Sequence, residues 1–274
     1  MIKLAFMSSV CPDWTLGEVA GAMKEHGYSG FEPRVEWGHV CGVEADLPAD
    51  RRRETRDLFA SEGLEICCLA TGVRMAEPDA SERAHHIEDL RRYLDLAADL
   101  GCGLVRTFGG RRDRGVEWAE VVDYVASGYR QVVDQARDAG VTLLLETHDD
   151  WSATAPVRAV IEAVDHPCLQ VLWDFMHPQR MMETPAESFL AVGMLTRHTH
   201  AHDGRCVGGG LQLLDRLGDG EIDHAVPLQL LNRAGFEGYV SVEVINRSGS
   251  GYDAEAALTQ HAGELRRLAA SPSG

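Results

Sequence analysis

The chain has 274 residues and a formal charge of −17, with 45% hydrophobic and 25% charged residues, a composition typical of a globular protein with a full core. The acidic surplus argues against a surface that grips nucleic acid or an anionic membrane, because both need a basic face. The seven scattered cysteines contain no C-x-x-C, and no run of 18 apolar residues occurs. We therefore expect no disulfide framework, no signal peptide, no membrane span and a cytoplasmic location.

Short apolar runs alternate with longer helical patterns along the whole chain. Strands are predicted at residues 2–7, 30–33, 64–70, 104–108, 141–146, 169–174, 196–202 and 239–244. Helices are predicted at residues 15–26, 49–62, 81–100, 116–139, within 156–164, and at 185–192, 223–234 and 253–268. Eight strand–helix units predict an α/β fold, a single (β/α)8 TIM-barrel domain over residues 1–270 with a loose tail at 271–274. A doubly wound open sheet is the runner-up, but no G-x-G-x-x-G follows the first strand.

The last four predicted strands each carry a polar side chain near their carboxyl end. Glu146 ends the fifth strand, Asp174 ends the sixth, and His200 and Glu243 lie on the seventh and eighth. Because these strand ends meet at one mouth of a barrel, the four side chains are expected to converge. Three carboxylates and one imidazole form a site for a divalent cation. Each residue taken alone is equally well explained as a loop residue or a helix cap.

The seventh strand carries three histidines in alternation. His198, His200 and His202 face the same way in steps of about 6–7 Å, so only one lies at the depth of a single cation. We expect His200 to be the ligand, His198 to lie deeper in the barrel with a hydrogen-bond partner, and His202 to lie nearer solvent.

Other residues that follow strands are candidate contacts for a substrate at this mouth. His177 lies three residues past Asp174, Glu32 ends the second strand, and Trp14 follows the first. Each has a plainer explanation, because His177 fits a surface loop, Glu32 fits a pair with Arg34, and Trp14 fits packing.

Several motifs resemble the sugar isomerase/epimerase group of xylose-isomerase-like barrels, which includes ketose 3-epimerases, hydroxypyruvate isomerases and inosose dehydratases. The strongest are LETH at 145–148, WDFMH at 173–177, HTHAHD at 198–203, GDGEID at 218–223 and GFEGYVSVE at 235–243. They are specific for the superfamily and do not name a substrate.

The resemblance implies roles for individual residues. It implies a metal site of Glu146, Asp174, His200 and Glu243, the same four residues that the strand ends select. It also implies that Glu146 and Glu243 move the proton and that His177 binds substrate. Arg205 is the nearest match to a substrate-binding arginine, at a spacing that differs from the epimerase pattern. Many relatives carry Lys where this chain has His202, which leaves the role of His202 open.

These residues predict a divalent-metal-dependent isomerase or epimerase that acts on a small keto-sugar by proton transfer through an enediolate. The alternatives are a dehydratase of a cyclic polyol ketone of inosose or dehydroshikimate type, an endonuclease IV-like nuclease, and a non-catalytic sugar-binding barrel. The donor set favours Mn²⁺ and leaves Mg²⁺, Co²⁺ and Zn²⁺ open. The expected partner is a small sugar or keto-polyol, with no nucleic acid and no membrane, and a homodimer is left open.

Overall fold

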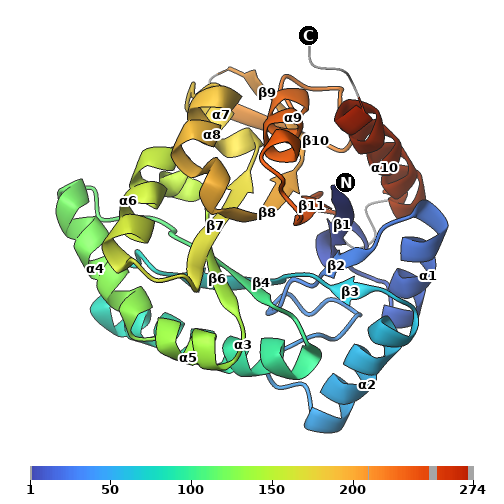
Figure 1. Ribbon diagram of the computed structural model, residues 1–274, viewed down its shortest axis with the longest axis horizontal. Coiled ribbons are helices and arrows are strands. Elements are labelled where there is room, and N and C mark those ends of the chain that lie inside the picture. Colours follow the sequence, from blue (N-terminus) through green and yellow to red (C-terminus); the bar gives the residue numbers. More distant parts are fainter. Residues whose placement is uncertain (1, 209, 247–251, 271–274) are drawn as a thin grey trace.

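The computed structural model describes residues 2–208, 210–246 and 252–270, and shows a ring of strands surrounded by helices (Figure 1). The ring is a nine-stranded parallel sheet in the order β3-β2-β1-β11-β8-β7-β6-β5-β4. Its strands are β1 Lys3–Met7, β2 Gly30–Glu32, β3 Glu65–Ile66, β4 Leu69–Arg74, β5 Leu104–Phe108, β6 Thr142–Glu146, β7 Leu169–Asp174, β8 Thr196–Ala201 and β11 Tyr239–Val242.

The sheet closes on itself because β3 and β4 are two pieces of one barrel strand. Only Cys67 and Cys68 separate them, and the backbone N–H of Ala70 donates to the carbonyl of Pro33 at 3.0 Å. The N–H of Val35 donates back to the carbonyl of Ala70 at 3.1 Å, so the segment after β2 is bonded to β4. The fold is therefore the predicted (β/α)8 barrel.

Helices connect the strands and cover the outside of the ring. They are α1 Leu16–His26, α2 Ala49–Ser61, α3 Ala80–Leu100, α4 Trp118–Arg130, α5 Val133–Asp138, α6 Thr154–Val164, α7 Met176–Arg180, α8 Pro185–Val192, α9 Ala225–Arg233 and α10 Ala254–Ala270. Among the described residues, three 3₁₀ turns also occur, η1 Ser8–Val10, η2 Asp149–Trp151 and η3 Gly193–Leu195. No helix in the described part of the chain is long and apolar enough to cross a membrane.

The structure differs from the predicted elements by one or two residues at several ends, and more substantially in the following places. The strand predicted at 64–70 is split and extends to Arg74, and the helix predicted at 116–139 breaks into α4 and α5. Helix α7 was not predicted. Neither was an antiparallel hairpin of β9 Asp203–Val207 and β10 Gly210–Leu214. The predicted tail at 271–274 lies outside the described residues.

The lower interior of the barrel is filled by small and apolar side chains. Ala5, Cys67 and Tyr239 form one buried cluster, and Leu144 and Leu172 pack together with Cys68 in another. Gly30 is required beside the first cluster, because a Cβ at that position would lie 2.5 Å from the Tyr239 ring. This packing closes the lower end of the barrel, so a polar site is confined to the carboxyl ends of the strands.

Candidate active site

Four side chains from neighbouring strands meet at the carboxyl end of the barrel. Glu146 is the last residue of β6, Asp174 is the last residue of β7, His200 lies on β8, and Glu243 directly follows β11. One nitrogen or oxygen from each lies within 4.8 Å of those of the other three, and all four residues are buried. The structure thus brings together the four residues selected from the sequence, which we call the quartet.

The quartet carries buried oxygens that accept no hydrogen bond. They are Glu146 Oε2, Asp174 Oδ2 and Glu243 Oε2. Each has an Arg or His nitrogen nearby: Arg106 Nε lies 3.2 Å from Glu146, His202 Nε2 2.7 Å from Asp174, and His200 Nδ1 3.1 Å from Glu243. Burying ionised oxygens without hydrogen bonds is costly. A divalent cation among them would remove that cost, so the residues fit such an ion.

Glu32 lies beneath the quartet and orients the ring of His200. Its Oε1 is 3.0 Å from His200 Nε2, and its Oε2 is 2.9 Å from His198 Nε2. When Nε2 of His200 donates to Glu32, Nδ1 is left to face Glu146 and Glu243, each 3.1 Å away. A carboxylate behind a histidine in this way fixes which ring nitrogen is offered to a metal.

The buried carboxylates and histidines around Glu32 and His200 stabilise one another's charged forms. Burial raises the pKa of Glu32, but His200 and His198 outweigh it and hold that pKa well below its ordinary value. Burial lowers the pKa of His200, but Glu32, Glu243 and Glu146 outweigh it and raise the pKa well above its ordinary value. Without a metal, His200 therefore holds a proton at the place where a cation would bind.

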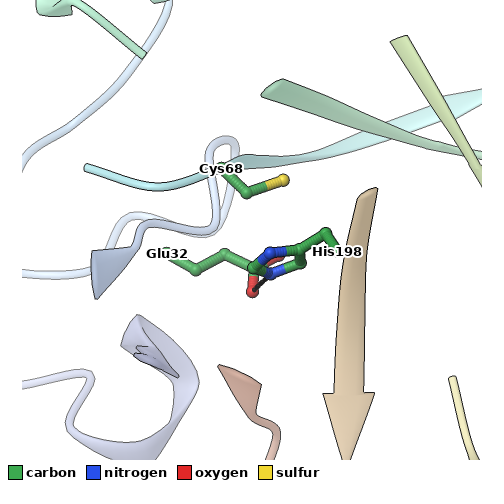
Figure 2. A group of neighbouring side chains, drawn as sticks. All are labelled: Glu32, Cys68 and His198. Atoms are coloured by element: carbon green, nitrogen blue, oxygen red, sulfur yellow. Dashed lines mark hydrogen bonds and ion pairs between the residues drawn. The ribbon is translucent and has the colours of Figure 1, made fainter. Parts of the chain in front are cut away.

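Figure 2 shows a deeper group in which Glu32 and His198 meet and the sulfur of Cys68 lies beside them. Their donor atoms are close enough for a metal. However, burial raises the pKa of the Cys68 thiol well above its ordinary value, and metal ligation needs the thiolate. Both oxygens of Glu32 are already used by histidines. We therefore assign this group to positioning. His198 on β8 therefore lies in this deeper group with Glu32 as its hydrogen-bond partner, as the alternation of the three histidines predicted.

Asp174 also belongs to a second cluster, with His177 and His202. Burial lowers the pKa of His202, but Asp174 outweighs it and raises that pKa to about 9. His202 is 6% exposed and His200 is 0% exposed, in the predicted order. Arg180 Nη1 donates to His177 Nδ1 at 3.0 Å, which leaves Nε2 of His177 as a donor rather than a metal ligand. Burial lowers the pKa of His177 to about 4, so its ring is neutral near pH 7.

Three other residues were predicted from the sequence as substrate contacts, and the structure places them as follows. Arg205 is exposed on β9 and donates to the carbonyl of Asp219 at 2.9 Å. Trp14 is partly buried and packs against the hydrophobic core. Glu32 has no exposed surface, and its contacts with His198 and His200 favour a positioning role over the substrate contact expected from the sequence.

Two arginines at the site were not predicted as site residues. Arg106 on β5 is 1% exposed, lies 3.2 Å from Glu146 and donates to the carbonyl of Thr71 at 2.7 Å. Arg34 follows β2, is 7% exposed and lies over the ring of Trp37. In the sequence, Arg106 could have been identified as a site residue because it is a charged residue inside an otherwise apolar strand. Arg34 could have been identified because it lies two residues after Glu32, so that the two side chains share a face of an extended segment.

Fold and site define this chain as a (β/α)8 barrel with a buried polar cluster at its mouth. The family model described as xylose isomerase-like TIM barrel matches residues 20–268, and the chain belongs to that family. No curated protein sequence matches the chain significantly.

Solved structures with the same fold include a zinc-binding protein and two sugar epimerases. The IolI protein with a bound zinc atom superposes with a TM-score of 0.84, at 18% identity and 98% coverage of both chains. An L-ribulose 3-epimerase has a TM-score of 0.81 at 17% identity, covering 98% of this chain and 95% of its own. The 3-keto-D-glucoside 4-epimerase YcjR from E. coli has a TM-score of 0.79 at 18% identity, covering 97% and 100%. At such identities the likeness shows the fold alone.

Proposed function

We propose that the protein is a divalent-metal-dependent isomerase or epimerase that moves a proton at the carbon beside the carbonyl of a small keto-sugar. The observation that carries this proposal is the quartet, in which three carboxylates and one imidazole converge within 4.8 Å at the mouth of the barrel. The epimerases among the structural neighbours support the same class, and the zinc atom in the IolI structure supports a bound metal.

Glu146, Asp174, His200 and Glu243 would hold the metal. A divalent cation there would polarise the carbonyl and a neighbouring hydroxyl and make the adjacent C–H more acidic. The mostly oxygen donor set favours Mn²⁺. Since the IolI structure contains zinc, Zn²⁺ belongs in the same tests.

Glu146 and Glu243 are the residues that we assign to proton transfer. They come from strands separated by β7 and β8, and each lies 3.1 Å from His200 Nδ1. Two carboxylates placed on either side of a bound sugar can remove a proton from one face and return one to the other, as epimerisation requires. His177, with Nε2 as a donor, would bind a substrate oxygen.

The test is a panel of ketoses and cyclic ketones incubated with the Mn²⁺-loaded or Zn²⁺-loaded protein in deuterated water. We expect a new sugar isomer of unchanged composition that carries solvent deuterium, detected by NMR and mass spectrometry. The control is the His200→Ala protein, which should give neither product nor exchange. Turnover that is equal in this variant, or absent with every compound and metal, would contradict the proposal.

A dehydratase is the second candidate, because removal of the same proton can be followed by loss of a β-hydroxyl. The probable 3-DHS dehydratase AsbF from Bacillus anthracis shares the fold, with a TM-score of 0.78 at 17% identity and coverage of 97% and 99%. Loss of one water from the product mass distinguishes this reaction from isomerisation.

A further inference from the structure

Arg34 lies two residues after Glu32 along the chain, on the side of the carboxyl end of the barrel. We call the space between Arg34 and the quartet the reaction chamber. Side chains alternate along an extended strand, so residues 32 and 34 share a face. The parallel bridge between Arg34 and Ala70 continues this pairing beyond β2. Glu32 points inward to His198 and His200, so Arg34 points inward at the next level toward the mouth. Burial and Arg106 lower the pKa of Arg34 to about 10, while Glu243 and Glu146 act in the opposite direction, which places the guanidinium near these two carboxylates.

The guanidinium of Arg34 is buried, held in place and unused. Its central carbon lies 3.7 Å from the centre of the Trp37 ring, which fixes the plane of the group. Its Nε is buried without a hydrogen-bond partner, and among the described residues its side chain forms no ion pair within 4.0 Å. Arg106, by contrast, contacts Glu146 and donates to Thr71. A buried guanidinium with unused donors is costly unless a ligand supplies acceptors.

The charges around the quartet accommodate a ligand with one negative charge better than a ligand with two. The four buried carboxylates Glu32, Glu146, Asp174 and Glu243 carry −4, whereas a divalent cation with Arg34 and Arg106 carries +4, before histidines are counted. A carboxylate would add one negative charge to this balanced group, whereas a phosphate ester would add nearly two. A planar carboxylate also matches the fork of N–H donors on a guanidinium.

We propose that Arg34, stacked on Trp37, binds the carboxylate of the substrate, so that the natural substrate is a keto-sugar acid rather than a neutral ketose. This assignment rests on the proposed function and narrows it to one substrate class. Arg34 is then a specificity-determining residue, which holds the end of the substrate remote from the reacting carbon.

The experiment compares binding of D-fructuronate, D-fructose and D-fructose 6-phosphate to the Mn²⁺-loaded protein by calorimetry. These ligands differ at carbon 6, as a carboxylate, a hydroxyl and a phosphate. We expect the acid to bind about 10–100-fold more tightly than the ketose, from the usual strength of a charged hydrogen-bonded pair. Arg34→Gln should remove that preference and leave ketose binding within about threefold, while Arg34→Lys should keep part of it.

Arg114→Gln is the matched control, because the Arg114 side chain is 82% exposed on the loop after β5 and contacts Asp150. It should keep the preference for the acid. Equal binding of acid and ketose to the wild type, an unchanged preference in Arg34→Gln, or tightest binding of the phosphate would each overturn the assignment. Circular dichroism and metal content of the Arg34 variants separate loss of the carboxylate contact from loss of fold.

The two proposals fail in different ways. If acid binding depends on Arg34 but no keto-sugar is turned over, the proposed reaction is wrong and the carboxylate site stands. The opposite case is that neutral ketoses are turned over, and Arg34→Gln changes neither their kcat/KM nor the preference between acid and ketose. The proposed reaction then stands and the carboxylate site is wrong.

Discussion

Below the level of Glu32, the barrel interior is filled by Ala5, Cys67 and Tyr239 on one side and by Leu144 and Leu172 on the other. Above that level, carboxylates, histidines and two arginines occupy the same interior, and several of their buried atoms lack hydrogen bonds. Both regions are made by the same alternation of strand residues. The lower one gains stability from packing, and the upper one gives up stability to keep atoms free for a ligand. Changes above should therefore alter chemistry, and changes below should alter stability.

The largest effect is expected for the two glutamates assigned to proton transfer. Glu146→Gln and Glu243→Gln keep the size of the side chain but remove the base. Each should lower kcat by about 10²–10⁴, the usual worth of general acid–base catalysis. Steady-state kinetics on the substrate found in the panel measures this, with metal content checked in parallel. Near wild-type rates in both variants would move the proton transfer elsewhere, with His177 as the next residue to test.

A smaller effect is expected for Glu32→Gln, because Glu32 orients His200 from beneath the quartet and is not one of the four proposed ligands. Its loss should weaken metal binding about 10–100-fold, the usual cost of removing a partner behind a ligand. Competition with a metal chelator measures this affinity. Cys68→Ser, in the same deep group, is the matched control and should leave the affinity nearly unchanged. A full effect in Cys68→Ser would show that the thiol is a ligand.

Metal affinity should rise with pH, because the cation replaces a proton on His200. The pKa of His200 is raised by Glu32, Glu243 and Glu146 despite burial, so this proton is held above pH 6.5. Below the raised pKa the apparent affinity should fall about tenfold for each unit of pH. The same proton stabilises the metal-free fold below about pH 6.5, and this contribution is lost as pH rises through the raised pKa. Calorimetry in buffers of different ionisation enthalpy measures the released proton, and a pH-independent affinity would contradict the exchange.

In the lower region, Gly30→Ala should cost stability and leave the chemistry unchanged. The added Cβ would lie 2.5 Å from the Tyr239 ring and 2.9 Å from the Ala5 Cβ, which predicts a loss of about 1–3 kcal/mol. Gly21→Ala, in helix α1 with open space around it, is the control and should be neutral or stabilising by up to about 1 kcal/mol. Thermal unfolding measures both. A loss of metal binding in folded Gly30→Ala protein would show that the two regions are coupled.

His202→Ala should have the smallest effect on metal binding. His202 contacts Asp174 at 2.7 Å but lies outside the quartet, so most of the affinity should remain. His200→Ala should remove it. The reverse order in a metal titration would show that the ligand is His202, which directly follows β8.

The sequence was sufficient for features that depend on alternation and strand ends. Strands at 104–108 and 169–174 were predicted with the observed bounds, and the quartet followed from the meeting of strand ends at one mouth. The break between α4 and α5 was not predicted, although Gly128 lies in the last turn of α4. There the carbonyl of Gln131 accepts a hydrogen bond from Arg91 at 2.8 Å, a contact made only in the folded barrel. The place of Arg34 likewise depends on barrel closure against Ala70.

One cation bound by the quartet is central to the proposed chemistry, and anomalous diffraction from crystals of the Mn²⁺-loaded protein tests for it directly. We expect one peak, with oxygens of Glu146, Asp174 and Glu243 and a nitrogen of His200 about 2.0–2.3 Å from it. A peak held instead by Asp174, His177 and His202, or no peak at saturating Mn²⁺, would contradict the account.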